Sequence, residues 1–143
     1  MSKVTLYGSS LSLYTGRARS YLIKAGIPYE ETLPNSQHFQ ANVLPRMGQR
    51  SSIPVIETEA GEVVRDGAAI IDYYEAINNQ YFSPVNPKQK TLSLLFDVIG
   101  AEGLLRPAMH YRWNFPEENL DFLTFHFECF APPNLDKKQM AEK

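Results

Sequence analysis

Hydroxyl side chains gather near the start of the chain, in the stretch "GSSLSLYTG", which holds Ser9, Ser10, Ser12 and Thr15. Ser12 and Thr15 have the spacing of the two thiols in a Cys-x-x-Cys redox motif, but neither is a cysteine. The chain has one cysteine, Cys129, so no internal disulfide is possible. Taken alone, Ser12 is interpreted as a helix N-cap, because serine is a preferred residue at that position.

The elements that position these hydroxyls follow from residue periodicity. Val4 to Tyr7 alternates and is predicted to be a strand, and residues 13–25 have helical apolar spacing and end before Gly26. "IPYEET" predicts a second strand, and residues 34–52 predict an irregular stretch around one short helix. "IPVIET" and "EVVRD" predict a hairpin, and "DGAAIIDYYEAINN" predicts a helix. This order favours a βαβ unit followed by a ββα unit.

The stretch "YFSPVNP" is predicted to be a linker because it has two prolines and no periodicity, and only helical patterns follow it. Residues 88–113 are predicted to be helical, with Pro107 as a kink or interruption, and residues 117–130 form a second, aromatic-rich helix. The predicted domains are 1–79, an α/β domain, and 88–143, a partial all-α domain, joined by the linker 80–87. Because two helices alone bury their apolar faces poorly, we expect further chain or another subunit to cover them.

Net charge and the length of the apolar runs exclude some classes of function. The net charge is −2, with 14 basic and 16 acidic residues, which argues against a nucleic-acid partner. The apolar runs are too short to cross a membrane, and no signal-peptide pattern begins the chain, so we expect a cytoplasmic protein. His126 and Cys129 share a helix face, but no further ligand accompanies them, so no metal site is predicted.

Four stretches in this order resemble the glutathione transferases: "LYGSSLSLYTGRAR", "GIPYEE", "SIPVIE" and "VVRDGAAIIDYYE". The last is similar to the family's stretch acidic-Ser-x-Ala-Ile-x-x-Tyr-Leu. The resemblance implies a thioredoxin-like N-terminal domain that binds glutathione, followed by the start of the family's helical domain. "GQRSSIP" also resembles the turn before the cis-proline of glutaredoxins, which share this fold.

The resemblance implies roles for two hydroxyls. Ser12 stands where serine-type transferases place their catalytic hydroxyl. There it would stabilise the glutathione thiolate by hydrogen bonding, beside the partial positive charge of a helix N-terminus. Tyr7 is the alternative, because tyrosine-type members use a tyrosine at the end of this first strand. Ser9 and Ser10 are nearby rivals that ordinarily serve as loop serines.

The resemblance also implies a binding surface for glutathione. Pro54 fits the family's cis-proline, and Ile53 before it would pair its backbone with the cysteine unit of the tripeptide. Asp66 and Gly67 would meet the γ-glutamyl end at a helix start. Gly67 replaces the family's serine and so lacks its hydroxyl. Arg50 is a candidate for the glycine end.

The function implied is a glutathione transferase in which glutathione is the co-substrate and attacks a small hydrophobic electrophile. A homodimer is implied as well. Two alternatives remain open. Gly67 and the short helical part favour a non-catalytic binding or assembly module on the same fold. "GQRSSIP" favours a glutaredoxin-like thiol reductase, against which the missing Cys-x-x-Cys argues.

Overall fold

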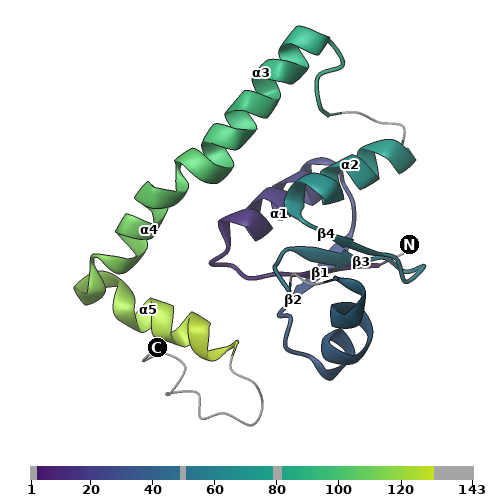
Figure 1. Cartoon of the computed structure of the whole chain (residues 1–143). Helices are drawn as coiled ribbons and strands as arrows, with labels where there is room; N and C mark the ends of the chain where they lie inside the picture. Colours follow the sequence, from purple (N-terminus) through teal and green to yellow (C-terminus); the bar gives the residue numbers. More distant parts are fainter. Residues whose placement is uncertain (1–2, 49–50, 79–81, 131–143) are drawn as a thin grey trace. The chain divides into compact units, whose positions relative to one another are not determined.

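A computed structural model of the chain describes residues 3–48, 51–78 and 82–130. Within it the chain divides into two compact units, residues 1–80 and 81–143, and each is described by itself. The first unit is built on a four-stranded sheet with the order β2-β1-β3-β4 (Figure 1). The strands are β1 (Val4–Tyr7), β2 (Tyr29–Thr32), β3 (Val55–Glu57) and β4 (Val63–Arg65).

Strand pairing confirms the predicted βαβ and ββα units. β1 runs parallel to β2 and antiparallel to β3, and β3 pairs antiparallel with β4. The helix α1 (Leu13–Lys24) connects the parallel pair, and α2 (Gly67–Asn78) follows the hairpin. Gly26 has a positive φ of 65° after the end of α1, a conformation that glycine adopts without steric cost.

Two cores lie on the two faces of the sheet. α1 and α2 lie side by side over one face (Figure 1), where Leu6, Leu22 and Ile70 are fully buried. The other face carries the short π-helix η1 (Phe39–Val43) and the 3-10 helix η2 (Leu44–Arg46), within the stretch predicted to be irregular around one short helix. A second cluster forms there from five buried residues: Tyr7, Phe39, Val43, Met47 and Val55.

The second unit is helical. It contains α3 (Pro87–Val98), the short π-helix η3 (Ile99–Gly103), α4 (Leu105–Trp113) and α5 (Pro116–Glu128). The long helix predicted over residues 88–113 is interrupted, but not at Pro107. The break is η3, and Pro107 lies in the first turn of α4, where a missing N–H costs nothing.

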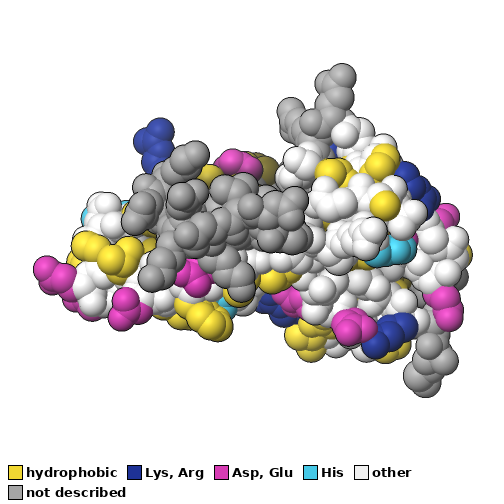
Figure 2. Space-filling model, turned by 90° about the horizontal axis from the view of Figure 1, so that it is seen from below, with side chains coloured by type: hydrophobic (Ala, Val, Ile, Leu, Met, Phe, Trp, Pro, Cys, Tyr) yellow, Lys and Arg dark blue, Asp and Glu magenta, His cyan; other side chains and the backbone are white. Residues whose placement is uncertain are grey.

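Acidic, basic and apolar side chains are interspersed on the face drawn in Figure 2, where neither sign of charge forms a large patch. In the described part of the chain, no helix combines the length and apolar character needed to span a bilayer.

Candidate functional site

Three connections meet at one end of the sheet. Tyr7, the last residue of β1, pairs with Val55, the first residue of β3. Val55 in turn pairs with Arg65, the last residue of β4. The loop before α1, the turn before β3 and the start of α2 therefore leave the sheet at the same end. Most of the site residues predicted from the sequence lie in these three segments.

Ser12 is the N-cap of α1. Its backbone is extended (φ −83°, ψ 118°), and its Oγ accepts a hydrogen bond from the Thr15 N–H at 3.1 Å. A hydroxyl has one donor proton and two acceptor lone pairs, so capping leaves the O–H able to donate elsewhere. The side chain is half-buried. The two interpretations of Ser12, helix cap and donor to an anion, are therefore compatible in this geometry.

The neighbouring serines differ from Ser12. Ser9 is 5% exposed, and its hydroxyl accepts from the Leu11 N–H at 3.2 Å, so it stabilises the loop from within. The Ser9 backbone is also tied to α1, since its N–H donates to Thr15 Oγ1 and its carbonyl accepts from Arg19. Ser10 is exposed. Of the three hydroxyls, only that of Ser12 caps the helix whose N-terminus faces this end of the sheet.

Tyr7 lies on the other face of the sheet, in the cluster with Phe39. Its hydroxyl donates to Glu57 Oε2 at 3.0 Å, and His38 Nε2 lies 2.8 Å from the same oxygen. Burial, reinforced by the hydrogen bond to Glu57 and the charge of that carboxylate, raises the pKa of Tyr7 to about 12. The Tyr7 proton is thus committed to Glu57, which leaves Ser12 as the better placed hydroxyl for a bound thiolate.

The turn before β3 has the geometry that the resemblance implies. The Ile53–Pro54 peptide bond is cis, and Pro54 is fully buried. The Pro54 carbonyl accepts from the Asp66 N–H at 3.0 Å, which joins this turn to the start of α2. Among the described residues, none forms a hydrogen bond with the backbone of Ile53. The N–H and C=O of Ile53 are therefore available for an extended peptide.

Asp66 caps the start of α2. Its Oδ1 accepts from the Ala68 N–H at 2.8 Å, and its own carbonyl accepts from the Ile70 N–H. The backbone of Asp66 has a φ of 83°, a left-handed conformation that costs a non-glycine residue energy. The carboxylate is exposed, so capping does not remove it from contact with a ligand.

Gly67 is buried where α1 packs against α2. A Cβ at this position would lie 3.2 Å from Arg17 Cδ and 3.5 Å from the Tyr14 carbonyl oxygen. A side chain at this position would therefore require Arg17 to shift by a few tenths of an ångström. Sequence reasoning missed this contact, because the pairing of α1 with α2 is not encoded in local spacing. The only signal was the presence of a glycine at a position where the family has serine.

The other residues singled out from the sequence lie in the second unit or outside the described part of the chain. Arg50 lies outside the described residues. In α5, His126 contacts the rings of Phe122 and Phe125, and directly after this helix the Cys129 thiol donates to the Phe125 carbonyl. Over residues 3–48, 51–78 and 82–130, no three His, Cys, Asp or Glu side chains come together as metal ligands.

Comparison with protein-family models gives one match relevant to this geometry. Residues 11–77 match the model described as "Glutathione S-transferase, N-terminal domain". This region contains Ser12, Pro54 and Asp66. Comparison with curated proteins gives no match.

Solved structures match over nearly the whole chain. A glutathione S-transferase from Rhodospirillum rubrum F11 has a TM-score of 0.63 at 14% identity, over 97% of this chain and 74% of that one. Glutathione transferase Omega 3C from Trametes versicolor has a TM-score of 0.61 at 17% identity, over 96% and 69%. A glutathione transferase homolog from Sulfitobacter, solved with bound glutathione, has a TM-score of 0.55 at 12% identity, over 99% and 80%.

At identities of 12–17%, these structural similarities establish the fold and not the chemistry. They confirm the predicted fold class, a thioredoxin-like α/β unit followed by helices. Residues 11–77 of this chain thus match the N-terminal domain family of the glutathione S-transferases, and the chain has the fold of glutathione transferases.

Proposed function

We propose that this chain binds glutathione at the end of the sheet where Ser12, Ile53 and Asp66 lie. There it promotes attack of the glutathione sulfur on a small hydrophobic electrophile. The proposed setting is the cytoplasm, and the proposed assembly is a homodimer, which light scattering of the purified chain tests. The support for glutathione comes from the family match of residues 11–77 and from the Sulfitobacter homolog, which was solved with glutathione bound.

The observation that carries this proposal is the hydrogen bonding of Ser12. Its oxygen accepts from the Thr15 N–H, which leaves the O–H able to donate to a sulfur beside the N-terminus of α1. A thiol has a pKa of about 8.5 and is mostly protonated at neutral pH. A hydrogen bond to the charged form and the partial positive charge of the helix both favour the thiolate.

The proposed reaction begins when the glutathione thiol releases its proton to solvent. The thiolate, held by the Ser12 O–H, forms a carbon–sulfur bond with the electrophile. In a displacement, the leaving group departs with the electron pair of the broken bond. In an addition, the adjacent carbon takes a proton from water. Ser12 forms no covalent bond and keeps its proton throughout.

The backbone of Ile53 and the carboxylate of Asp66 have the proposed binding roles. The free N–H and C=O of Ile53 suit the cysteine unit of glutathione, which can add as a short extended strand. The Asp66 carboxylate is exposed at the start of α2 and suits the ammonium group of the γ-glutamyl end. The carboxylate of that same end would lie near Arg17, which packs against Gly67.

The test is a titration of the thiol of bound glutathione, followed by the ultraviolet absorbance of the thiolate across pH. In the wild type we expect a pKa below that of free glutathione. A hydrogen bond to a charged group contributes about 1.5–3 kcal/mol, so loss of the hydroxyl in Ser12→Ala is expected to raise this pKa by about 1–2 units.

Two variants separate catalysis from capping. Glycine at an N-cap costs only a few tenths of a kcal/mol relative to serine, whereas alanine costs about 1 kcal/mol. Ser12→Gly is therefore expected to lose thiolate stabilisation with little loss of stability. Asn86→Ala removes the N-cap of α3, where Asn86 accepts from Lys88, and is expected to lower stability without affecting the thiol pKa. An unchanged thiol pKa in both Ser12 variants would refute the role of Ser12.

A second candidate function is a non-catalytic binding or assembly module. The packing of Arg17 against Gly67 favours it, because this position lacks the hydroxyl that the resemblance implies for gripping glutathione. Calorimetry decides between the two functions. If glutathione does not bind at millimolar concentration, the module is the better interpretation, and Ser12 is a helix cap alone. A thiol reductase is the least supported, since the only cysteine, Cys129, lies near the end of α5 and not at α1.

A further inference from the structure

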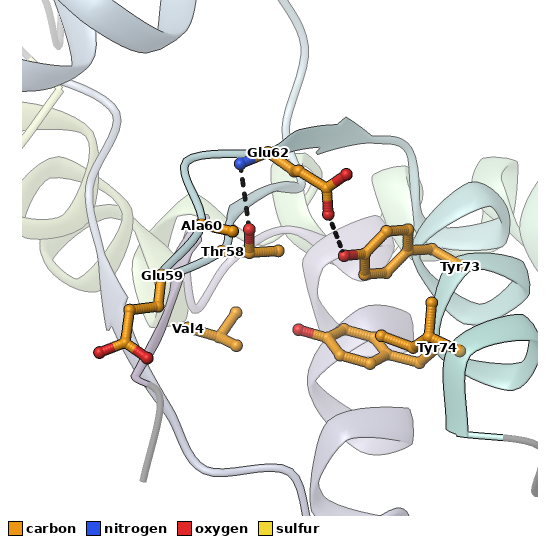
Figure 3. Close-up of a pocket in the computed structure, with 8 residues that line it drawn as sticks. Val4, Thr58, Glu59, Ala60, Glu62, Tyr73 and Tyr74 are labelled. Carbon is orange, nitrogen blue, oxygen red and sulfur yellow. Dashed lines mark hydrogen bonds between the residues drawn. The ribbon is translucent and has the colours of Figure 1, made fainter.

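A pocket opens at the end of the sheet opposite Ser12. It has a volume of about 430 Å³, which is within the range of small-molecule sites. Its wall is formed by Val4 at the start of β1, by the β3–β4 turn, and by Tyr74 and Ile77 from the second half of α2 (Figure 3). β3 runs antiparallel to β1, so its last residues lie beside the start of β1 and away from Pro54.

A buried hydroxyl points into this pocket without a partner. Tyr74 is 5% exposed, and within the described residues its hydroxyl forms no hydrogen bond. In Figure 3 this hydroxyl points toward Val4. Buried polar groups are nearly always hydrogen-bonded, and one left unpaired costs about 1–3 kcal/mol. Burial raises the pKa of Tyr74 to about 12, so the hydroxyl remains a donor at neutral pH.

Packing alone does not require this hydroxyl. A leucine would fill an apolar position between the helix and the sheet without a polar atom. The hydroxyl is therefore not needed for packing, and within the described residues it has no hydrogen-bond partner.

The rim of the pocket is acidic. Glu59 and Glu62 line it, and both side chains are exposed. The Tyr73 hydroxyl donates to Glu62 Oε2, and the Glu62 N–H donates to Thr58 Oγ1, so this carboxylate is held in place at the mouth (Figure 3). Among the described residues that line the pocket, none is a lysine or an arginine. A cation at the mouth would therefore meet negative charge that nothing in the pocket wall offsets.

We propose that this pocket binds a small arylalkyl amine that carries a neutral oxygen acceptor. The ammonium group lies beside the Glu62 carboxylate, the apolar body packs on Val4, Ile77 and the tyrosine rings, and the oxygen accepts from Tyr74. This site is separate from the proposed glutathione site. It adds a small-molecule site that the proposed transferase reaction does not use.

The first experiment is calorimetry of the full chain with three probes of similar size. Tyramine has both the ammonium and the oxygen, phenethylamine lacks the oxygen, and 3-(4-hydroxyphenyl)propionate replaces the cation with an anion. We expect tyramine to bind about 5–10-fold more tightly than phenethylamine, which corresponds to one hydrogen bond, and the propionate not to bind. Tyr74→Phe is expected to abolish the difference between the two amines, and Glu62→Gln to weaken both.

The second experiment measures the thermal stability of Tyr74→Phe without any probe. Because the hydroxyl lacks a partner, its removal is expected to leave Tm unchanged or to raise it. The variant is also expected to keep the glutathione titration of the wild type, so the two sites are tested separately. The proposal is overturned if Tyr74→Phe lowers Tm by several degrees, which would reveal a partner for the hydroxyl. It is equally overturned if tyramine fails to bind at millimolar concentration, or binds no better than phenethylamine.

Discussion

Substitution of Gly8 by alanine tests how the first turn of α1 is held against the sheet. A Cβ at Gly8 would lie 2.2 Å from Thr15 Cγ2 and 2.9 Å from Thr15 Oγ1. Carbon atoms in contact are separated by about 3.5–4.0 Å, so one group has to move by more than about 1 Å. Thr15 cannot yield easily, because it is fully buried and its Oγ1 accepts from the Ser9 N–H.

The expected loss of stability in Gly8→Ala follows from this overlap. Overpacking of a core by a methyl group costs about 1–3 kcal/mol, and the close approach here puts Gly8→Ala near the upper end. For a unit of this size, 1 kcal/mol corresponds to about 4–8 °C in Tm, so we expect a fall in Tm of about 10–20 °C. Thermal denaturation followed by circular dichroism measures it. Glutathione binding is expected to weaken as well, because displaced α1 residues include the Ser12 cap.

Two further variants make the test specific. Thr15→Ser removes the Cγ2 atom, so the double variant with Gly8→Ala is expected to recover a large part of the lost stability. Gly16→Ala places a methyl group on the same helix, where nothing lies within 4 Å, and is expected to stabilise the chain by up to about 1 kcal/mol. The reasoning is refuted if Gly8→Ala behaves like Gly16→Ala, or if Thr15→Ser gives no recovery.

Three other predictions concern the surroundings of the site. Arg19→Lys is expected to lower stability by about 1 kcal/mol in urea denaturation, because Arg19 donates from two nitrogens to the two oxygens of Glu31 at 2.7 Å and a lysine ammonium cannot reproduce this planar geometry; equal stability would contradict this. The pKa of Tyr7 is raised from 10 to about 12 in the folded chain, so the unfolded chain loses this proton first as pH rises. The contribution of Tyr7 to stability is therefore complete below pH 10 and is lost between about pH 10 and 12, by up to about 1.4 kcal/mol per pH unit. Tyr7→Phe is expected to flatten that part of a pH–stability curve. Gly67→Ser is expected to fold after a small shift of Arg17 and to bind glutathione several-fold more tightly in calorimetry, whereas weaker binding would show that Arg17 cannot move.

The secondary structure of the first unit could be predicted because its signals are local. Alternation marks β1, and Gly26 has the positive φ expected after a helix end. The cis bond before Pro54 was predicted from the resemblance alone, since most X–Pro peptide bonds are trans. In the second unit the break at η3 was missed, because Ile99–Gly103 contains no proline and the visible proline, Pro107, is tolerated in a first turn.

The contacts that shape the site could not be predicted, because they join residues far apart in sequence. Tyr7 donates to Glu57, fifty positions away, and nothing in the local sequence around Tyr7 indicates this bond. The packing of Arg17 on Gly67 and the unpaired hydroxyl of Tyr74 depend equally on how α2 lies on α1 and on the sheet. Periodicity says which face of a helix is buried, but it does not say what that face meets.

The dual hydrogen bonding of Ser12 has a consequence for how related sequences are interpreted. One oxygen atom caps α1, and the proton on the same atom is the proposed donor to sulfur. A descendant that lost glutathione chemistry would still be selected to keep this serine, because the helix cap alone is worth about 1 kcal/mol. A serine at this position in another chain is therefore no marker of transferase activity.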